Sequence, residues 1–249
     1  MNPVAAAAPG SAPALQGVFS AVRSQTAFEE TLDRLATAIK LGLLEPGARL
    51  PAERELCARL GISRSTLRQA LTALVQSGHL RAVRGRGGGT FVVPRPPPAD
   101  PPTAEVLAGW REVCDVRLAT ELGVVVLAAE RADRGALAAL DPLVGEMSSV
   151  LEDFPAYRRA DVRLHIGLAE CTGSARLVTA MTEVQGAMGD LIAHIAHPAQ
   201  VLASSNAQHA RLLAAVAAGD AVRATRVATE HLRGTEHVLG GLLPNAGAP

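Results

Sequence analysis

The sequence predicts a mainly α-helical protein: an N-terminal winged helix-turn-helix with a small β-wing, then a C-terminal all-α bundle of about six helices. Two observations support this fold class. Between Pro46 and Val93, two short helical patterns are joined by a tight turn and followed by a glycine-tipped hairpin pattern. From Thr103 to Leu243, apolar residues recur at the i, i+3, i+4 spacing of helices, and no segment shows convincing strand alternation.

Changes in composition divide the chain into five parts. Residues 1–17 are rich in alanine and proline and carry no charge, so we expect a disordered tail. Residues 18–93 form the expected winged domain. Pro94–Pro102 is too rich in proline for a helix or a central strand and is expected to be a stiff linker. Residues 103–243 form the helical domain, and 244–249 form a second tail.

The first helix is expected to begin at Thr26, because Glu29 three residues later completes a capping box. The pattern runs to Gly42. The first helix of the helix-turn-helix is expected to start at Pro51, where a missing N–H is harmless. Its acidic first turn suits the helix dipole, and its leucines share one apolar edge.

The second helix of the motif is expected to follow a turn at Gly61 and to be capped by Ser63. Leu67, Leu71 and Leu74 recur at i, i+4, i+7, so they should face the core. The opposite face then carries the side chains that a recognition helix presents to the major groove. These are Arg64, Ser65, Thr66 and Arg68.

Positive charge is concentrated in this motif. The segment from Ala52 to Val93 holds seven arginines and two glutamates, a net charge of +5, although the whole chain has a formal net charge of zero. A basic helix-turn-helix with a basic wing is the electrostatic pattern of a DNA-binding protein.

The run PGxRLPxERELxxxLGxSRxTxRxALxxLxxxGxLxxxxGxGxxFV resembles the winged helix-turn-helix of the GntR family of bacterial transcription regulators, from about Phe28 to Val93. The resemblance implies a phosphate contact from the first helix of the motif, base contacts from the recognition helix, and a minor-groove contact from the wing. The implied DNA-binding residues are Arg54, Ser63, Arg64, Ser65, Thr66, Arg68, Arg84, Gly85 and Arg86. The run 87–89 contains more glycine than the usual wing tip.

The helical domain has the opposite charge. From Thr103 to Pro249 there are twelve arginines and seventeen acidic residues, a net charge of −5, so this domain is not expected to contact DNA.

No apolar stretch is long enough to span a bilayer, and the N-terminus lacks a secretion signal, which predicts a soluble cytoplasmic protein with no membrane partner. The cysteines are three in number and widely spaced, and they suggest neither a disulfide framework nor a cysteine zinc site.

Four residues of the helical domain could form a metal site. Asp161 and His165 are spaced i, i+4 on one expected helix. His209 and His231 each lie eleven residues from Asp220, so an antiparallel hairpin would place both imidazoles at one level. Three histidines and one aspartate suit a first-row transition metal with open positions. The spacing alone fits buried polar groups or surface residues equally well.

Two segments of this domain resemble the FCD ligand-binding domain, the C-terminal partner in the FadR subgroup of GntR regulators. They are DVRLHIGLAECTGSARL and QHARLLAAVAAGDAVRATRVATEHL. The resemblance implies a divalent transition metal, zinc first, with nickel or manganese as alternatives. The implied ligands are Asp161, His165, His209 and His231. Leu164 replaces the common Phe and Ser174 the usual Asn, which suggests an unusual effector.

Arg117 and Glu121 are spaced i, i+4 on the first long helix of the domain. Spacing alone indicates a salt bridge within the helix. In the resembling family, the arginine at this position binds an effector's carboxylate, so both residues are expected at the effector site. His194 and His197 precede Pro198 and are better explained by the favourable placement of histidine at a helix C-terminus.

Together these features predict a homodimeric transcription regulator that is not an enzyme. Most regulators of the resembling family are repressors, so the resemblance implies a repressor. A palindromic DNA operator and a small organic acid, bridged between the metal and Arg117, are its expected partners. One alternative is a constitutive DNA-binding protein whose helical domain only dimerises. Another is a metal-dependent hydrolase, which the sequence disfavours because no HExxH motif occurs and Glu170 lies off the face of His165.

Overall fold

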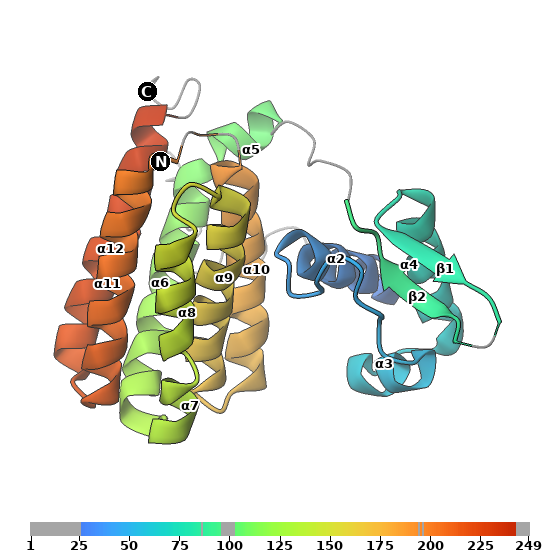
Figure 1. Cartoon of the computed structure of the whole chain (residues 1–249), viewed down its shortest axis with the longest axis horizontal. Helices are drawn as coiled ribbons and strands as arrows, with labels where there is room; N and C mark the ends of the chain where they lie inside the picture. Colours follow the sequence, from blue (N-terminus) through green and yellow to red (C-terminus); the bar gives the residue numbers. More distant parts are fainter. Residues whose placement is uncertain (1–25, 86, 96–102, 194, 196, 243–249) are drawn as a thin grey trace, which may run out of the picture.

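The structure, a computed structural model, describes residues 26–85, 87–95, 103–193, 195 and 197–242. These residues form a winged helical domain and a helical bundle (Figure 1). The expected tails, 1–17 and 244–249, lie outside the described residues, as does most of the expected linker. No helix in the described part of the chain is long and apolar enough to cross a membrane.

The winged domain begins with α2 (Ala27–Lys40), which Thr26 and Glu29 start with the expected capping box. The motif itself consists of α3 (Glu53–Leu60) and α4 (Arg64–Gln76). Gly61 ends α3 with a left-handed φ of 66°. Ser63 then caps α4, because its Oγ accepts a hydrogen bond from the Thr66 N–H at 3.1 Å.

The wing is an antiparallel pair of β1 (Leu80–Val83) and β2 (Gly89–Val92), in which Leu80 lies opposite Val92. Its turn requires glycine at Gly88, because an added Cβ would lie 2.4 Å from the Val83 carbonyl oxygen. Of the glycine run at the tip, Gly88 is therefore required by a close backbone approach.

The bundle confirms the expected fold class. Its described part contains six helices of nine or more residues and two of five residues. They are α5 (Ala104–Ala108), α6 (Trp110–Arg131), α7 (Arg134–Ala138), α8 (Asp141–Ser149), α9 (Phe154–Glu170), α10 (Ala175–Ile192), α11 (Ala199–Ala217) and α12 (Ala221–Leu242). α6 packs against α9, α10, α11 and α12, so residues from these helices meet in the interior. The main core includes Val124, Leu164, Met181 and Leu212.

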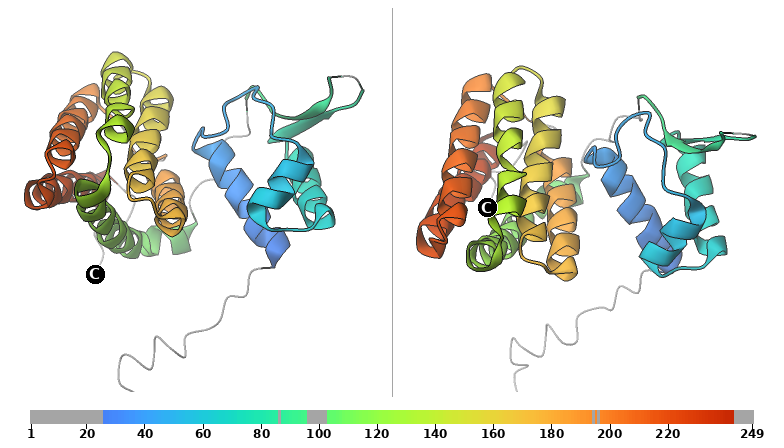
Figure 2. Two further views of the ribbon diagram at one scale, coloured as in Figure 1. Left: turned by 90° about the horizontal axis from the view of Figure 1, so that it is seen from below. Right: turned by 60° about the horizontal axis from the view of Figure 1, so that its bottom comes forward.

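The two domains touch through α2 and α10 (Figures 1 and 2). Lys40 Nζ lies 2.5 Å from Asp190 Oδ1, and Gly186 on α10 lies against Thr37. Leu41, directly after α2, is 3% exposed and belongs to the bundle core rather than to the core of the winged domain. Leu41, which follows the last residue of α2, is therefore held by the core of the bundle.

Candidate nucleic-acid interface and metal centre

The exposed face of α4 carries most of the residues expected to bind DNA. Leu67, Leu71 and Leu74 are buried, which turns the opposite face of the helix to solvent. On that face Arg64, Ser65 and Arg68 are exposed and Thr66 is half-buried. The side-chain hydroxyl of Ser63 is hydrogen-bonded to that of Ser65 at 2.7 Å and to that of Thr66 at 2.8 Å.

The arginines of the motif differ in their partners. Arg68 Nε donates to Glu53 Oε2 at 2.9 Å, an ion pair that links α4 to α3. Arg54 on α3 is exposed, and within the described residues neither it nor Arg64 forms an ion pair. Both guanidinium groups are therefore available to phosphates or base edges.

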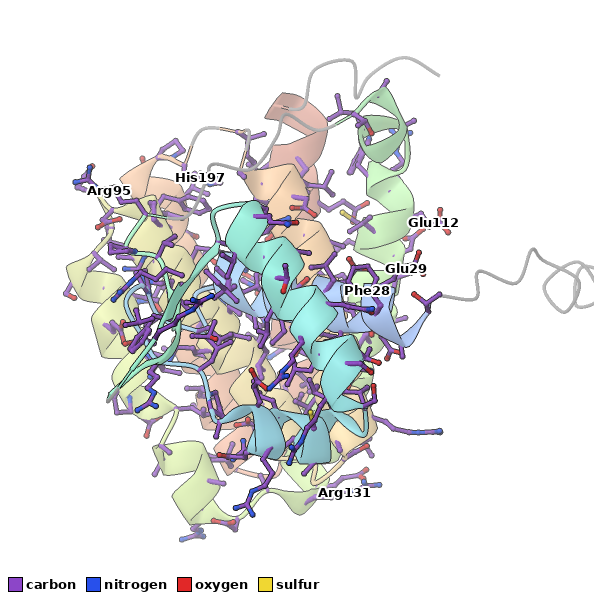
Figure 3. All side chains as sticks on the ribbon, turned by 90° about the vertical axis from the view of Figure 1, so that its right-hand side faces the viewer. Phe28, Glu29, Arg95, Glu112, Arg131 and His197 are labelled. Atoms are coloured by element: carbon purple, nitrogen blue, oxygen red, sulfur yellow. The ribbon has the colours of Figure 1, made fainter. Side chains whose placement is uncertain are left out.

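The wing extends on the side of its domain away from the bundle (Figure 2). Arg84 and Gly85 are exposed near its tip, whereas Arg86 lies outside the described residues. Arg49 fixes the wing from the preceding segment, because its guanidinium donates to the Gly88 carbonyl at 2.6 Å. Figure 3 faces this domain, with Phe28 and Glu29 marking the start of α2.

The four residues expected as metal ligands lie together inside the bundle, and we call them the His–Asp cluster: Asp161, His165, His209 and His231. They come from α9, α11 and α12, and each is at most 7% exposed. His209 Nε2 lies 3.3 Å from both Asp161 Oδ1 and His231 Nε2. His165 Nε2 lies 3.7 Å from the same Asp161 oxygen.

This geometry fits a metal ion. Ligand atoms that each bind a transition metal at about 2.0–2.2 Å lie about 3.0–3.5 Å apart, close to the separations found here. One ring nitrogen from each of the three histidines lies within 4.8 Å of the others. In addition, His165 Nε2 is buried without a hydrogen-bond partner among the described residues, and a metal would satisfy it.

Neighbouring side chains orient two of the rings. Glu121 Oε2 lies 2.7 Å from His165 Nδ1, and Gln208 Oε1 lies 3.2 Å from His231 Nδ1. These contacts turn both Nε2 atoms toward the cluster, as second-sphere partners of metal ligands do. Glu121 also accepts a hydrogen bond from Arg117 Nε at 2.8 Å. Glu121 thus connects Arg117 to the cluster.

Burial and charge set the protonation of the cluster. Burial lowers the pKa of His209 to about 4 and holds the pKa of His231 well below its usual value. Burial also opposes a charge on His165, but the carboxylates of Glu121 and Asp161 outweigh it and raise its pKa to about 9. The pKa of Asp161 is held well below its usual range, because the interactions of its carboxylate with His165 and Arg158 outweigh burial.

A cavity of about 410 Å³ opens beside the cluster, and we call it the bundle cavity. Asp161, His231 and Arg117 line its polar end. Glu121 is buried behind Arg117 and is not among the lining residues.

Sequence reasoning missed two polar residues of this site. Arg158 lines the cavity, forms an ion pair with Asp161, and donates through Nη2 to the Gln185 carbonyl at 2.9 Å. Its i, i+3 spacing from Asp161 was a usable signal, because that spacing places both on one helix face. The side chain of Gln185 donates to Glu121 at 2.9 Å from α10, and no local pattern indicates this contact.

Comparison with known proteins agrees with this architecture. A model of bacterial regulatory proteins of the gntR family matches residues 28–92, and a model of the FCD domain matches residues 112–234. The chain is 33% identical to a Mycobacterium gastri protein named as the HTH-type transcriptional regulator RmpR, over 81% of this chain and 76% of that protein. The chain belongs to the GntR family.

Two further comparisons describe this GntR protein's relatives. It is 32% identical to an Escherichia coli K12 protein named as an L-lactate dehydrogenase operon regulatory protein, over 82% of this chain and 83% of that protein. The structure of E. coli McbR/YncC shares its fold, with a TM-score of 0.55 at 22% identity over 88% of this chain and 99% of the other. The relatives are named as regulators, so the protein is a DNA-binding transcriptional regulator and not an enzyme.

Proposed function

We propose that this GntR-family protein is a homodimeric transcriptional repressor whose operator affinity is controlled by a small carboxylate, and that it acts on DNA in the cytoplasm. Two winged domains of a dimer would bind the half-sites of a palindromic operator, because a twofold assembly matches a twofold-related site. The effector would bind in the bundle cavity and favour one arrangement of the two domains over another.

The observation that carries this proposal is the composition of the polar end of the bundle cavity. Arg117, Asp161 and His231 face one space whose volume is typical of small-molecule sites. Arg117 uses Nε to bind Glu121, so its terminal nitrogens remain for a ligand. A guanidinium beside a metal site is well suited to a carboxylate.

The His–Asp cluster would hold the divalent ion, for which zinc is the first candidate and nickel or manganese are alternatives. When bound, the ion supplies positive charge and open coordination positions for an anionic ligand. Glu121 and Gln208 would keep the rings of His165 and His231 oriented toward the ion.

Metal analysis tests the first half of the proposal. Purified protein should carry about one metal per chain, and chelation should lower its melting temperature by mass action. His209→Ala and His231→Ala should each remove the metal with helical content nearly intact. His237→Ala is the matched control, because His237 is exposed on α12 outside the cluster and should leave the metal in place. Full metal occupancy in either cluster variant would contradict the four-ligand site.

Effector control is tested by a thermal-shift screen of organic acids, followed by operator titration with each hit. A true effector should change operator affinity about 5–150-fold, the usual range of allosteric coupling. Arg117→Ala should remove this response and retain binding to DNA without effector. If hits stabilise the protein but leave operator affinity unchanged, the protein is instead a constitutive DNA-binding dimer.

A further inference from the structure

The bundle cavity carries its charged side chains at one end and is mainly apolar along the rest of its length. Its apolar wall is built by α9, α10, α11, α12 and the segment between α10 and α11. The apolar residues that line it include Phe154, Met188, Ile192, Ile195, Val201 and Val238. They gather at the end of the bundle where α9 and α11 begin and α10 and α12 end, at the top in Figure 1.

Helix geometry gives the length of this apolar part. Phe154 precedes Asp161 by seven residues on α9, and Val238 follows His231 by seven residues on α12. Val201 precedes His209 by eight residues on α11. At 1.5 Å of rise per residue, all three lie about 10–12 Å from the His–Asp cluster along the bundle axis. A ligand held at the cluster therefore has this length of apolar wall beside it.

The cationic side chains are confined to the polar end. Two arginines, Arg117 and Arg158, are among the described lining residues. Arg158 pairs with Asp161, a member of the His–Asp cluster. Arg117 pairs with Glu121, which contacts His165 of the cluster. At the apolar end, the ring of His197 (labelled in Figure 3) stacks on Phe154 with centroids 3.3 Å apart. Burial lowers the pKa of His197, which leaves its ring neutral.

A second negative charge at the apolar end would therefore lack a partner. The other polar side chains in the described lining, such as Gln200, Ser204 and Thr235, are uncharged. Phe154 and His197 are half-buried, and a carboxylate beside them without a cation is unfavourable, whereas methylene groups along this wall gain free energy on leaving water.

We propose that the effector is a monocarboxylate with an apolar body of about six to eight carbons, whose carboxylate lies at the His–Asp cluster and whose tail reaches the Phe154–His197 pair. This inference rests on the proposed function, because it assumes that a carboxylate binds at the cluster. It goes further by excluding short hydroxy acids and dicarboxylates as the best ligands of this site.

The test is a titration of the full-length, metal-loaded protein with butanoate, hexanoate, octanoate, octanedioate and L-lactate, each also assayed for its effect on operator affinity. Each methylene buried along the wall should raise affinity about fourfold, so affinity should rise at least about tenfold for each two carbons added. Octanedioate has the length of octanoate but carries a second carboxylate at the tail, and it should bind at least about tenfold more weakly.

A substitution at the apolar end adds a second test. Val201→Arg places a cation about 12 Å from the cluster and should shift the preference from octanoate toward octanedioate. Val222→Arg is the matched control, because Val222 is 84% exposed on α12 and does not line the cavity. The octanoate-to-octanedioate affinity ratio should be unchanged in this control.

The outcomes separate this inference from the proposed function. If L-lactate or octanedioate binds most tightly and changes operator affinity, the proposed function stands and the inference is overturned. An affinity that is flat along the acid series, or a ratio that Val201→Arg leaves unchanged, also overturns it. If none of the acids binds, or if binding never alters operator affinity, the proposed effector control fails and the inference fails with it.

Discussion

At the scale of single residues, Arg64 and Arg54 are predicted to contribute differently to DNA binding. Arg64 starts the recognition helix, so Arg64→Ala should cost about 1–3 kcal/mol on the operator and relax base preference. Arg54 lies on α3, outside the recognition helix, so Arg54→Ala should weaken all sequences about equally and flatten the salt dependence. Titrations with operator and scrambled duplexes distinguish the two, and equal loss of specificity in both variants would refute the assignment.

The raised pKa of His165 predicts that metal binding releases a proton. Without metal, the carboxylates around it raise its pKa to about 9, so the ring is charged at pH 7. A histidine must be neutral to bind a metal, so binding at pH 7 should release about one proton per chain, and metal affinity should rise with pH up to about 9. Calorimetry in buffers of different ionisation enthalpy measures this number. A binding enthalpy that is independent of the buffer would contradict it.

The raised pKa of His165 also makes the stability of the metal-free protein depend on pH. The folded pKa of His165 lies above its ordinary value of 6.5, so its charged form stabilises the fold fully below about pH 6.5. That stabilisation is lost as the pH rises from 6.5 through 9. Metal binding should replace it at high pH, so the difference in melting temperature between metal-loaded and chelated protein should widen over this range.

At the scale of elements, the wing is predicted to depend on Gly88. Gly88→Ala would place a methyl group 2.4 Å from the Val83 carbonyl oxygen, which forces the wing turn open. We expect weaker operator binding with unchanged metal content, because the bundle is not altered. Gly145→Ala on α8 is the control: no heavy atom lies within 4 Å of its added Cβ, and alanine stabilises a helix by up to about 1 kcal/mol. Unchanged operator affinity in Gly88→Ala would show that this turn does not position the wing.

The elements that the sequence predicted are those with local signals. The capping box at Thr26, the turn at Gly61 and the cap at Ser63 depend only on nearby residues, and the structure has all three. The spacings of the His–Asp cluster residues were also readable, because helical period and hairpin symmetry relate them. Arg158 could have been found in the same way, because it has the i, i+3 spacing from Asp161 that its neighbour Arg159 lacks. Gln185 could not, because no local pattern relates α10 to Glu121.

At the scale of the whole molecule, α10 lies between the bundle cavity and the winged domain. Met188 and Ile192 line the cavity, while Gly186 and Asp190 of the same helix contact α2. The sequence indicated only the linker Pro94–Pro102 as a connection between the domains. The contact between α2 and α10 could not be predicted from the sequence. Leu35 and Leu41 are both leucines, and nothing in the sequence shows that Leu35 packs into the winged domain while Leu41 packs into the bundle.

The α2–α10 contact is predicted to carry the effector response. Leu41→Ala removes a buried side chain that joins α2 to the bundle core, a change that typically costs about 2–5 kcal/mol in a core. The winged domain should then move independently, so the variant should retain both operator and effector binding while the effector-induced change in operator affinity falls toward onefold.

The control for this experiment is Leu143→Ala on α8, a residue of the same core that is 6% exposed and belongs to the bundle alone. It should lower the melting temperature comparably, because it leaves a similar cavity, yet keep the effector response. Operator titrations with and without effector measure the response in both variants. If Leu41→Ala keeps the full response, transmission must instead pass through Pro94–Pro102, and replacing that segment with glycine and serine should then weaken the response without abolishing effector binding.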